Sequence, residues 1–224
     1  MPGHDTTGRT GLFLSLEGPE GAGKTTLIRH LEAALSADAY TVVRTREPGG
    51  DPVGERVRDL LLHSGGGDDG AAGEPLSAEA ELLLFAAARA QNVRTVIRPA
   101  LEAGHVVLCD RFTDSTLAYQ GYGRGLSLET IQTVNAFATG GLFPDHTFLL
   151  DLPPALGLAR RPEAERNRLD REDLAFHERV RAGFLAVARA DQGRITVLDA
   201  SRGEAVVASD LVAQVRVLLL AGRG

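Results

Sequence analysis

The sequence is poor in several residue types, and each shortage excludes a class of protein. Its 224 residues contain no tryptophan and one cysteine, Cys109. One thiol cannot form a disulfide within the chain, which favours a reducing compartment and predicts a cytoplasmic protein. Residues 1–11 have no apolar core and do not resemble a secretory signal. The longest apolar stretch, LVAQVRVLLLAG, is too short to span a membrane and contains Arg216.

Positive charge is also scarce relative to negative charge. The net charge is −6 and the isoelectric point is about 5.5. A protein that wraps nucleic acid or coats an anionic membrane needs a basic surface, so we expect neither partner. The apolar fraction of 43% and charged fraction of 24% are typical of a globular domain. We therefore expect a flexible tail over residues 1–11 and a single domain over 12–224.

Short apolar runs alternate with segments of helical periodicity along the chain. Ser77 can cap a long helix that Pro99 bends or interrupts, and Ser127 can cap a helix that ends near Thr139. Such alternation predicts an α/β fold in which a five-stranded parallel sheet has helices on both faces. Ligands then bind at the carboxyl ends of the strands. The expected strands cover residues 12–18, 41–45, 105–110, 146–151 and 194–199.

Lys24 is the only lysine in the chain, against 23 arginines, and it lies in the motif GPEGAGKT. The motif matches G-x-x-x-x-G-K-[ST], and an apolar strand precedes it while a helix follows. Lys24 can reach the β- and γ-phosphates of ATP, and the Thr25 hydroxyl can contact Mg²⁺. A chance match is the alternative, which both flanking elements oppose. The expected ATP-binding residues are Gly18, Pro19, Glu20, Gly21, Ala22, Gly23, Lys24, Thr25 and Thr26.

The lysine count excludes one class of nucleotide-binding protein. Guanine-selective switch proteins use an N-K-x-D motif, which a chain without a second lysine cannot contain. A compact ammonium also fits inside the loop more easily than a forked guanidinium does. We therefore expect a P-loop protein that is not a regulatory GTPase.

A second anion site is expected after the strand VVLCDR. Asp110 at its end can orient Mg²⁺ through water, and Arg111 can grip a phosphate with two hydrogen bonds. A surface ion pair between these neighbours is the alternative interpretation. Cys109 is expected to be a packed strand residue.

Several stretches together resemble thymidylate kinases. A P-loop alone indicates only NTP binding, whereas DRFTDSTLAYQG is much more specific to this family. The resemblance implies a P-loop kinase fold of the nucleoside monophosphate kinase type, and a homodimer packed through helices. The stretches are EGPEGAGKTT, TREPGGDPVGERVR, LLLFAAARAQ, VVLCDRFTDSTLAYQGYGRG, DLPPALGLAR and NRLDREDLAFHERV, over about residues 12–185.

The resemblance also implies contacts to dTMP. Phe85 stacks on thymine and Arg89 donates to a thymine carbonyl; the two lie on one helix face because they are four residues apart. Glu20 meets the 3′-hydroxyl, and Tyr119 crowds the 2′ position, which favours a deoxyribose. The remaining contacts are Arg58 and Arg111 at the 5′-phosphate, and Ser115, Thr116 and Gln120 at the base edge.

Some of these residues have plainer interpretations. Phe85 can be an ordinary core residue, Ser115 and Thr116 can be helix caps, and Glu20 can be a solvated loop carboxylate. Glu47 in REPGG can touch the water shell of the metal, or it can simply be a turn carboxylate.

The segment GLARRPEAERNRLDRED predicts an arginine-rich lid over about residues 158–171. Some thymidylate kinases carry an arginine after the P-loop acid, where this chain has Gly21, so the pattern resembles the bacterial class in which the lid supplies that charge. Arg161 or Arg166 is expected at the transferring phosphoryl group, and Arg160 near the adenine. A solvated charged segment is the alternative. The glycine-rich residues 64–75 are expected to be a mobile surface loop.

The combined prediction is an enzyme that transfers the γ-phosphoryl group of ATP to dTMP, giving dTDP and ADP for dTTP synthesis. The expected catalytic residues are Lys24, Arg111, Arg161 and Arg166, and the expected metal contacts are Thr25, Asp110 through water, and Glu47. The alternatives are another P-loop nucleoside or nucleotide kinase and a non-catalytic ATP-binding switch.

Overall fold

The computed structural model describes residues 10–63 and 76–221. Residues 1–9 of the expected tail and the glycine-rich loop at 64–75 lie outside the described residues. Gly11, at the end of the expected tail, is held to the domain because its N–H donates to the Leu101 carbonyl at 3.0 Å.

The centre of the molecule is a five-stranded sheet in which every neighbouring pair of strands is parallel. The strand order is β2-β3-β1-β4-β5, so β1 lies in the middle between β3 and β4. Each strand lies within one residue of its predicted bounds, which confirms the predicted α/β class. The strands are β1 (Leu12–Glu17), β2 (Val42–Arg46), β3 (Val106–Asp110), β4 (His146–Asp151) and β5 (Ile195–Asp199).

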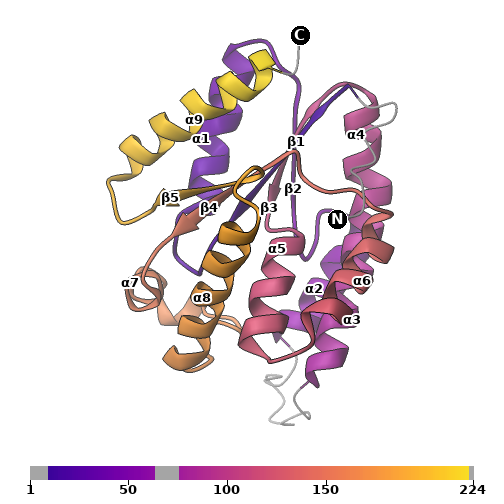
Figure 1. Cartoon of the computed structure of the whole chain (residues 1–224), viewed down its shortest axis with the longest axis vertical. Coiled ribbons are helices and arrows are strands. Elements are labelled where there is room, and N and C mark those ends of the chain that lie inside the picture. The colour runs from indigo at the N-terminus through magenta and orange to yellow at the C-terminus, as the bar shows by residue number, and fades with distance from the viewer. Residues whose placement is uncertain (1–9, 64–75, 222–224) are drawn as a thin grey trace.

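Helices cover both faces of the sheet (Figure 1). On one face, α1 (Lys24–Ala37) and α9 (Glu204–Ala221) pack side by side. On the other face, η1 and α4 pack against β1 and β3, while η2 and α8 pack against β4 and β5. The remaining bounds are α2 (Pro52–His63), α3 (Ala78–Asn92), η1 (Val93–Ile97), α4 (Arg98–Glu102), α5 (Thr113–Thr116), η2 (Leu117–Gly123), α6 (Leu128–Thr139), α7 (Pro154–Ala159), η3 (Glu163–Glu165) and α8 (Leu174–Ala190).

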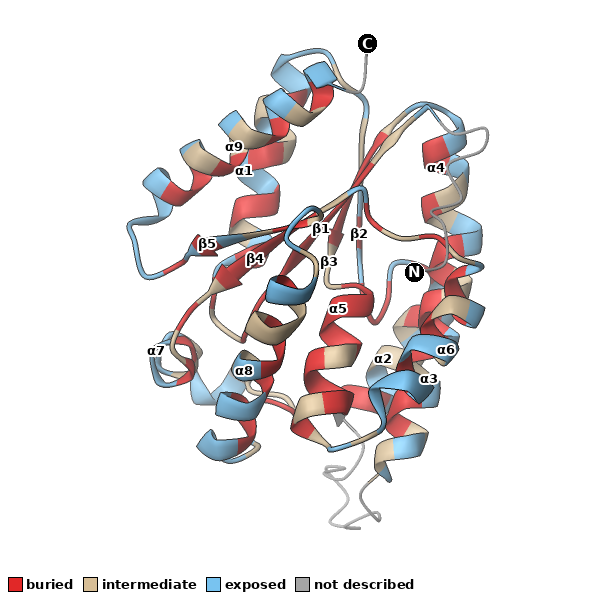
Figure 2. Cartoon of the chain, viewed as in Figure 1, coloured by how far each residue is buried: buried red, intermediate tan, exposed pale blue. Residues whose placement is uncertain are grey.

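The alternation of side chains along a strand explains why two cores form. In β1, Phe13 packs among the residues of η1 and α4, whereas the next residue, Leu14, packs against α1 and α9. Both are fully buried, and the three central strands β3, β1 and β4 carry mainly the buried colour in Figure 2, while the edge strands and the outer helices are mixed. Because helices cover both faces of the sheet, the central strands are largely apolar on both sides.

The predicted helix caps are confirmed, with one difference in the longest helix. The Ser77 hydroxyl accepts from the Ala80 N–H, and the Ser127 hydroxyl accepts from the Thr130 N–H. The single helix expected after Ser77 is instead three segments. The π-helical turn η1 separates α3 from α4, and Pro99 is the second residue of α4. A proline cannot donate to the preceding turn, which accounts for the break in regular α-helical bonding there.

The carboxyl ends of the parallel strands meet at one edge of the sheet. The P-loop follows β1, Glu47 follows β2, Arg111 follows β3, and β4 leads from Asp151 into α7. This edge therefore gathers the charged residues that the sequence singled out, as the topology of such sheets requires.

The P-loop and α7 touch backbone to backbone through two glycines. A Cβ atom on Gly157 would lie 2.1 Å from the Glu20 carbonyl oxygen, and one on Gly21 would lie 2.1 Å from the Gly157 carbonyl oxygen. The lid therefore begins on an element that is fitted closely to the P-loop.

We predict that Gly157→Ala destabilises the protein because the new methyl group must push α7 away from the P-loop backbone. The expected loss in the free energy of unfolding is about 1–3 kcal/mol, measured by urea unfolding. Gly193→Ala is the matched control, because a Cβ there meets nothing within 4 Å. Equal stability of the two variants would contradict the prediction.

Candidate active site

The P-loop, residues 18–25, curls around the side chain of Lys24. Gly18, Gly21 and Gly23 have φ angles of +139°, +66° and +90°, in the region that favours glycine. Lys24 Nζ donates to the carbonyl oxygens of Gly18 at 3.0 Å and Pro19 at 2.8 Å. The only ammonium of a lysine side chain in the protein is thus folded into the loop that the motif predicted.

The surroundings of Lys24 weaken its hold on its proton. Burial, followed by the nearby charge of Arg111, lowers the pKa of Lys24 to about 8, although Glu20 and Asp110 act in the opposite direction. A nearby polyanion would favour the charged form of this lysine.

Thr25 and Asp110 supply the side-chain oxygens that could bind a hard cation such as Mg²⁺. The Thr25 hydroxyl donates to Asp110 Oδ2 at 2.8 Å, which joins the start of α1 to the end of β3. Within residues 10–63 and 76–221, no three His, Cys, Asp or Glu side chains gather in a way that could hold a metal ion. Mg²⁺ commonly takes one or two protein oxygens together with substrate phosphates and waters, so this pair fits it without a full cage.

Glu47, the third metal contact expected from the sequence, has other partners. Its Oε2 accepts from Arg89 Nε at 2.7 Å and its Oε1 accepts from Asn92 Nδ2 at 3.3 Å. The carboxylate is buried and forms an ion pair with the Arg89 guanidinium. Glu47 also lines the P-loop cleft together with Thr25 and Asp110, so its expected contact to the water shell of the metal stays a prediction.

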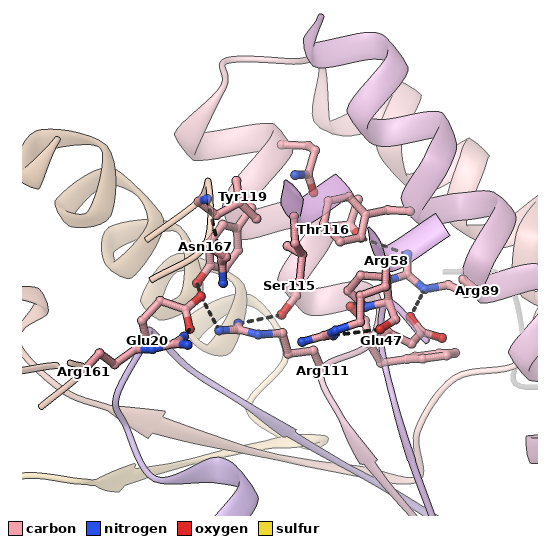
Figure 3. A pocket seen from close by; sticks show the side chains of 16 residues that line it. Glu20, Glu47, Arg58, Arg89, Arg111, Ser115, Thr116, Tyr119, Arg161 and Asn167 are labelled. Carbon is pink, nitrogen blue, oxygen red and sulfur yellow. Dashed lines mark hydrogen bonds and ion pairs between the residues drawn. The ribbon is translucent and has the colours of Figure 1, made fainter. Parts of the chain in front are cut away.

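Glu20 lies between the side chains of Arg111 and Arg161 (Figure 3). One carboxylate oxygen accepts from Arg111 Nη2 at 2.8 Å and from the Tyr119 hydroxyl at 2.9 Å, and the other accepts from Arg161 Nη1 at 3.3 Å. Burial alone would raise the pKa of Glu20, but Arg111, then Lys24, then the remaining partners lower it to about 2. Glu20 is thus an ionised, partly buried carboxylate and not a solvated loop residue.

Arg111 adopts a backbone conformation that is unusual for its residue type. Its φ angle is +70°, and its N–H donates to the Leu16 carbonyl at 3.0 Å. This turn brings the guanidinium beneath the P-loop, where Nη1 donates to Gly18 O at 2.9 Å and to Ser115 Oγ at 3.2 Å. Strain at such a position is kept where the surroundings hold it, and it is concentrated at functional sites.

Arg89 is fixed by hydrogen bonds to four different residues. Beyond Glu47, Nη1 donates to Thr116 Oγ1 at 2.9 Å and to Asn135 Oδ1 at 2.6 Å, and Nη2 donates to the Phe112 carbonyl at 3.0 Å. The side chain is 1% exposed. A guanidinium has five N–H groups, so one N–H on Nη2 remains for a ligand.

Two cavities meet at this cluster. All nine expected dTMP contacts line the side pocket, which is formed by Glu20, Glu47, Pro48, Arg58, Leu62, Phe85, Arg89, Arg111, Phe112, Ser115, Thr116, Tyr119, Gln120, Arg161, Asn167 and Leu169. The P-loop cleft is lined by Glu20, Gly21, Gly23, Lys24, Thr25, Thr26, Ile28, Arg44, Thr45, Arg46, Glu47, Gly50, Glu55, Arg58, Asp110, Arg111, Arg160 and Arg161.

The boundary between the side pocket and the P-loop cleft consists of charged residues with a net positive charge. The residues common to both linings are two acids and three arginines: Glu20, Glu47, Arg58, Arg111 and Arg161. Glu20 and Glu47 are each paired to an arginine, so the boundary suits two anionic groups that approach each other from opposite sides.

Comparison with known proteins agrees with this geometry. The family model described as "Thymidylate kinase" matches residues 16–211. A curated thymidylate kinase of Deinococcus radiodurans is 53% identical over 206 residues, covering 92% of this chain and 96% of that protein. The chain belongs to the thymidylate kinase family.

Further relatives of this thymidylate kinase family member support the same assignment. A thymidylate kinase of Synechococcus sp. (strain JA-3-3Ab) is 51% identical over 210 residues, covering 94% of this chain and 98% of that protein. The crystal structure of thymidylate kinase from Ehrlichia chaffeensis superposes with a TM-score of 0.71 at 33% identity, covering 92% and 98% of the two chains. This confirms the P-loop kinase fold. In the described part of the chain, no helix combines the length and apolar character needed to cross a membrane.

The structure separates the lid arginines of this thymidylate kinase family member. Arg161 Nη1 contacts Glu20 and also Asp170 Oδ1 at 3.1 Å, so it faces both cavities. Arg160 is exposed at the P-loop cleft, and its Nη1 donates to Gly21 O at 3.3 Å. Arg166 lines neither cavity. It pairs with Glu163 at 2.6 Å and donates to the Leu158 carbonyl at 3.0 Å.

Sequence reasoning missed part of the lid's contribution to the side pocket. Asn167 and Leu169 line the side pocket. The buried carboxylate of Asp170 accepts a hydrogen bond from Arg161 and so holds its guanidinium in place. Burial, and then the charge of Glu20, raise the pKa of Asp170 above its usual value. These residues lie in the stretch NRLD, where the sequence pattern drew attention to the arginines of the lid and not to Asn167, Leu169 or Asp170. Pro48, Leu62 and Phe112 also line the side pocket; Pro48 and Phe112 lie in the stretches that carry the family resemblance, but none of the three was singled out as a contact.

We predict that the buried ammonium of Lys24 makes stability depend on alkaline pH. The folded pKa is about 8 and the ordinary value is 10.5, so the unfolded chain binds more protons between these values and wild-type stability rises there with pH. Relative to Lys24→Met, the wild type should gain about 2 kcal/mol between about pH 7.5 and about pH 10. Urea unfolding of both proteins without nucleotide measures this gain.

The comparison between Lys24→Met and the wild type has an internal control. Titrating groups that do not interact with Lys24 contribute equally to both proteins and cancel in the difference, and Glu20, which does interact with it, has a pKa far below this pH range. Parallel stability profiles across this pH range would show that Lys24 has an ordinary pKa.

Proposed function

We propose that this protein transfers the γ-phosphoryl group of ATP to dTMP, giving dTDP and ADP for dTTP synthesis. The observation that carries the proposal is the basic boundary shared by the side pocket and the P-loop cleft. Three arginines lie between the P-loop and the side pocket, which is the proposed site of the base. A phosphotransferase needs this arrangement because two anions must meet in line.

The P-loop cleft is the proposed ATP site. The P-loop N–H groups and the amino end of α1 face the phosphates. When ATP binds, Lys24 Nζ donates to β- and γ-phosphate oxygens in place of the Gly18 and Pro19 carbonyls. Thr25 and Asp110 would hold Mg²⁺, Asp110 through water. When bound, the ion neutralises charge on the phosphates. Arg160, at the rim, is proposed to lie near the adenine.

The side pocket is the proposed dTMP site. Phe85 offers its ring face to thymine, and the remaining N–H of Arg89 donates to a thymine carbonyl. Tyr119 is held by Glu20 beside the sugar, where its ring disfavours a 2′-hydroxyl. Ser115, Thr116 and Gln120 face the base edge, while Arg58 and Arg111 receive the 5′-phosphate.

The chemistry requires positioning more than proton transfer. The attacking oxygen belongs to a phosphate monoester and is already anionic near neutral pH, so no general base is assigned. Arg111 and Arg161 stand at the boundary, where charge spreads over the transferring group. Arg161 is proposed as the lid arginine in this role because it faces both cavities, whereas Arg166 does not. Closure of the lid excludes water, which limits ATP hydrolysis.

Family membership supports two further proposals, on the oligomeric state and on the cellular compartment of the protein. We propose that it works as a homodimer in the cytoplasm, where its single buried thiol stays reduced. The buried environment of Cys109, followed by nearby carboxylates, raises the pKa of this thiol, so it is not a reactive nucleophile.

An acceptor panel tests the proposal directly. ADP release would be measured with Mg-ATP and dTMP, dUMP, dCMP, dAMP, dGMP, UMP or thymidine. We expect dTMP to be preferred and dUMP to be second, lower by about 10–200-fold in kcat/KM, because one methyl group in an apolar pocket supplies about 1–3 kcal/mol. Turnover of thymidine but not dTMP would show that Arg58 and Arg111 do not form an acceptor-phosphate site.

We predict that the two candidate lid arginines differ sharply in importance. Arg161→Met should lower kcat on the order of 10³-fold, because it removes a cation from the boundary where the phosphoryl group transfers. Arg166→Met should lower kcat by less than about tenfold, since Arg166 contacts only the lid itself. Steady-state kinetics with saturating dTMP and ATP measures both. A larger loss for Arg166→Met would reverse the assignment.

A further inference from the structure

Glu81 is a buried carboxylate that the proposed reaction does not use. It lies in the first turn of α3 and is 1% exposed. Its Oε1 accepts from Gln120 Nε2 at 2.7 Å and from Arg124 Nε at 3.2 Å, and its Oε2 accepts from Arg168 Nη2 at 2.5 Å. One carboxylate therefore joins a residue of the side pocket, a residue after η2 and a residue of the lid.

The contact with Glu81 fixes which way the Gln120 amide faces. Burial would raise the pKa of Glu81, but hydrogen bonds from Arg124, Gln120 and Arg168 keep it below its usual value. An ionised carboxylate only accepts hydrogen bonds, so it must face the NH₂ group of Gln120. The carbonyl oxygen, Gln120 Oε1, is left for the side pocket, and no group in the described part of the chain donates to it.

The same carboxylate also holds the lid over the side pocket. Arg168 Nε donates to the Leu61 carbonyl at 3.0 Å, and the Arg168 N–H donates to the Leu62 carbonyl at 3.2 Å. Its neighbours in the chain, Asn167 and Leu169, line the side pocket. Arg168 is therefore held between Glu81 and the end of α2, and its neighbours Asn167 and Leu169 are held in place at the side pocket as a result.

We propose that Glu81 is the positioning residue that makes the pocket selective for a base with an N3–H group. It does so by holding Gln120 Oε1 toward the base. Through Arg168, Glu81 also holds the lid against the pocket, which supports all acceptors alike and does not set the selectivity. Thymine and uracil donate a hydrogen bond at N3, whereas cytosine accepts one there. This inference rests on the proposed function and assigns its base selectivity to a residue outside the pocket lining.

The test compares Glu81→Gln with the wild type, using dTMP, dUMP and dCMP as acceptors. A glutamine at position 81 can face Gln120 with either end of its amide, so Gln120 is released to rotate. We expect the kcat/KM ratio of dTMP over dCMP to fall about tenfold or more. The ratio of dTMP over dUMP should stay within about twofold, because both bases carry the N3–H group and the methyl contact is untouched.

Matched variants separate this role from general damage. Glu79→Gln removes an exposed carboxylate from the same helical turn and should leave both ratios unchanged. In a Gln120→Leu background, Glu81→Gln should have no further effect on the ratio of dTMP over dCMP, since Glu81 acts through Gln120. Arg168→Met should lower kcat/KM for all three acceptors while keeping most of that ratio.

The outcomes distinguish the inference from the proposed function. A parallel fall of both ratios in Glu81→Gln, or no fall in either, would overturn the role of Glu81. If Glu81→Gln does not fold, an unchanged ratio of dTMP over dCMP in Gln120→Leu alone would overturn it equally. A wild-type protein that consumes no dTMP in this assay would instead contradict the proposed function.

Discussion

The site depends on the ion pairing of Glu20. Arg111 and Arg161 come from different segments and would repel each other in a partly buried setting if no anion stood between them. Glu20 supplies that anion from within the P-loop, and its pKa of about 2 keeps it ionised at any physiological pH. Tyr119 donates to the same carboxylate, so one side chain of the P-loop positions Arg111, Arg161 and Tyr119 in the side pocket.

Much of this fold could be predicted from the sequence because its signals are local. Apolar runs that end in polar motifs located all five strands, and serines before apolar periods located the caps of α3 and α6. The parallel topology then placed every motif at one edge. The break at η1 was predicted only in part: Pro99 indicated an interruption, but the sequence did not indicate that it takes the form of a π-helical turn over Val93–Ile97.

In the candidate site too, local signals could be found in the sequence, whereas contacts between distant residues could not. Residues inside specific motifs, such as Phe85 and Gln120, fell where the resemblance placed them, at the side pocket. Partnerships between distant charges did not follow from the sequence. The sequence did not indicate the ion pair of Glu47 with Arg89, and Glu81 gave no signal although it joins three polar side chains. Such pairings are set by tertiary distance, which spacing along a chain does not encode.

The shared boundary has a thermodynamic consequence for the two substrates. ATP and dTMP, bound as proposed, each bring negative charge to Arg58, Arg111 and Arg161, and each rearranges the same ion pairs. Their affinities therefore cannot be independent. The factor by which dTMP changes the affinity for ATP must equal the factor by which ATP changes the affinity for dTMP. Because the same residues line both cavities, the ATP site and the dTMP site form one coupled binding system.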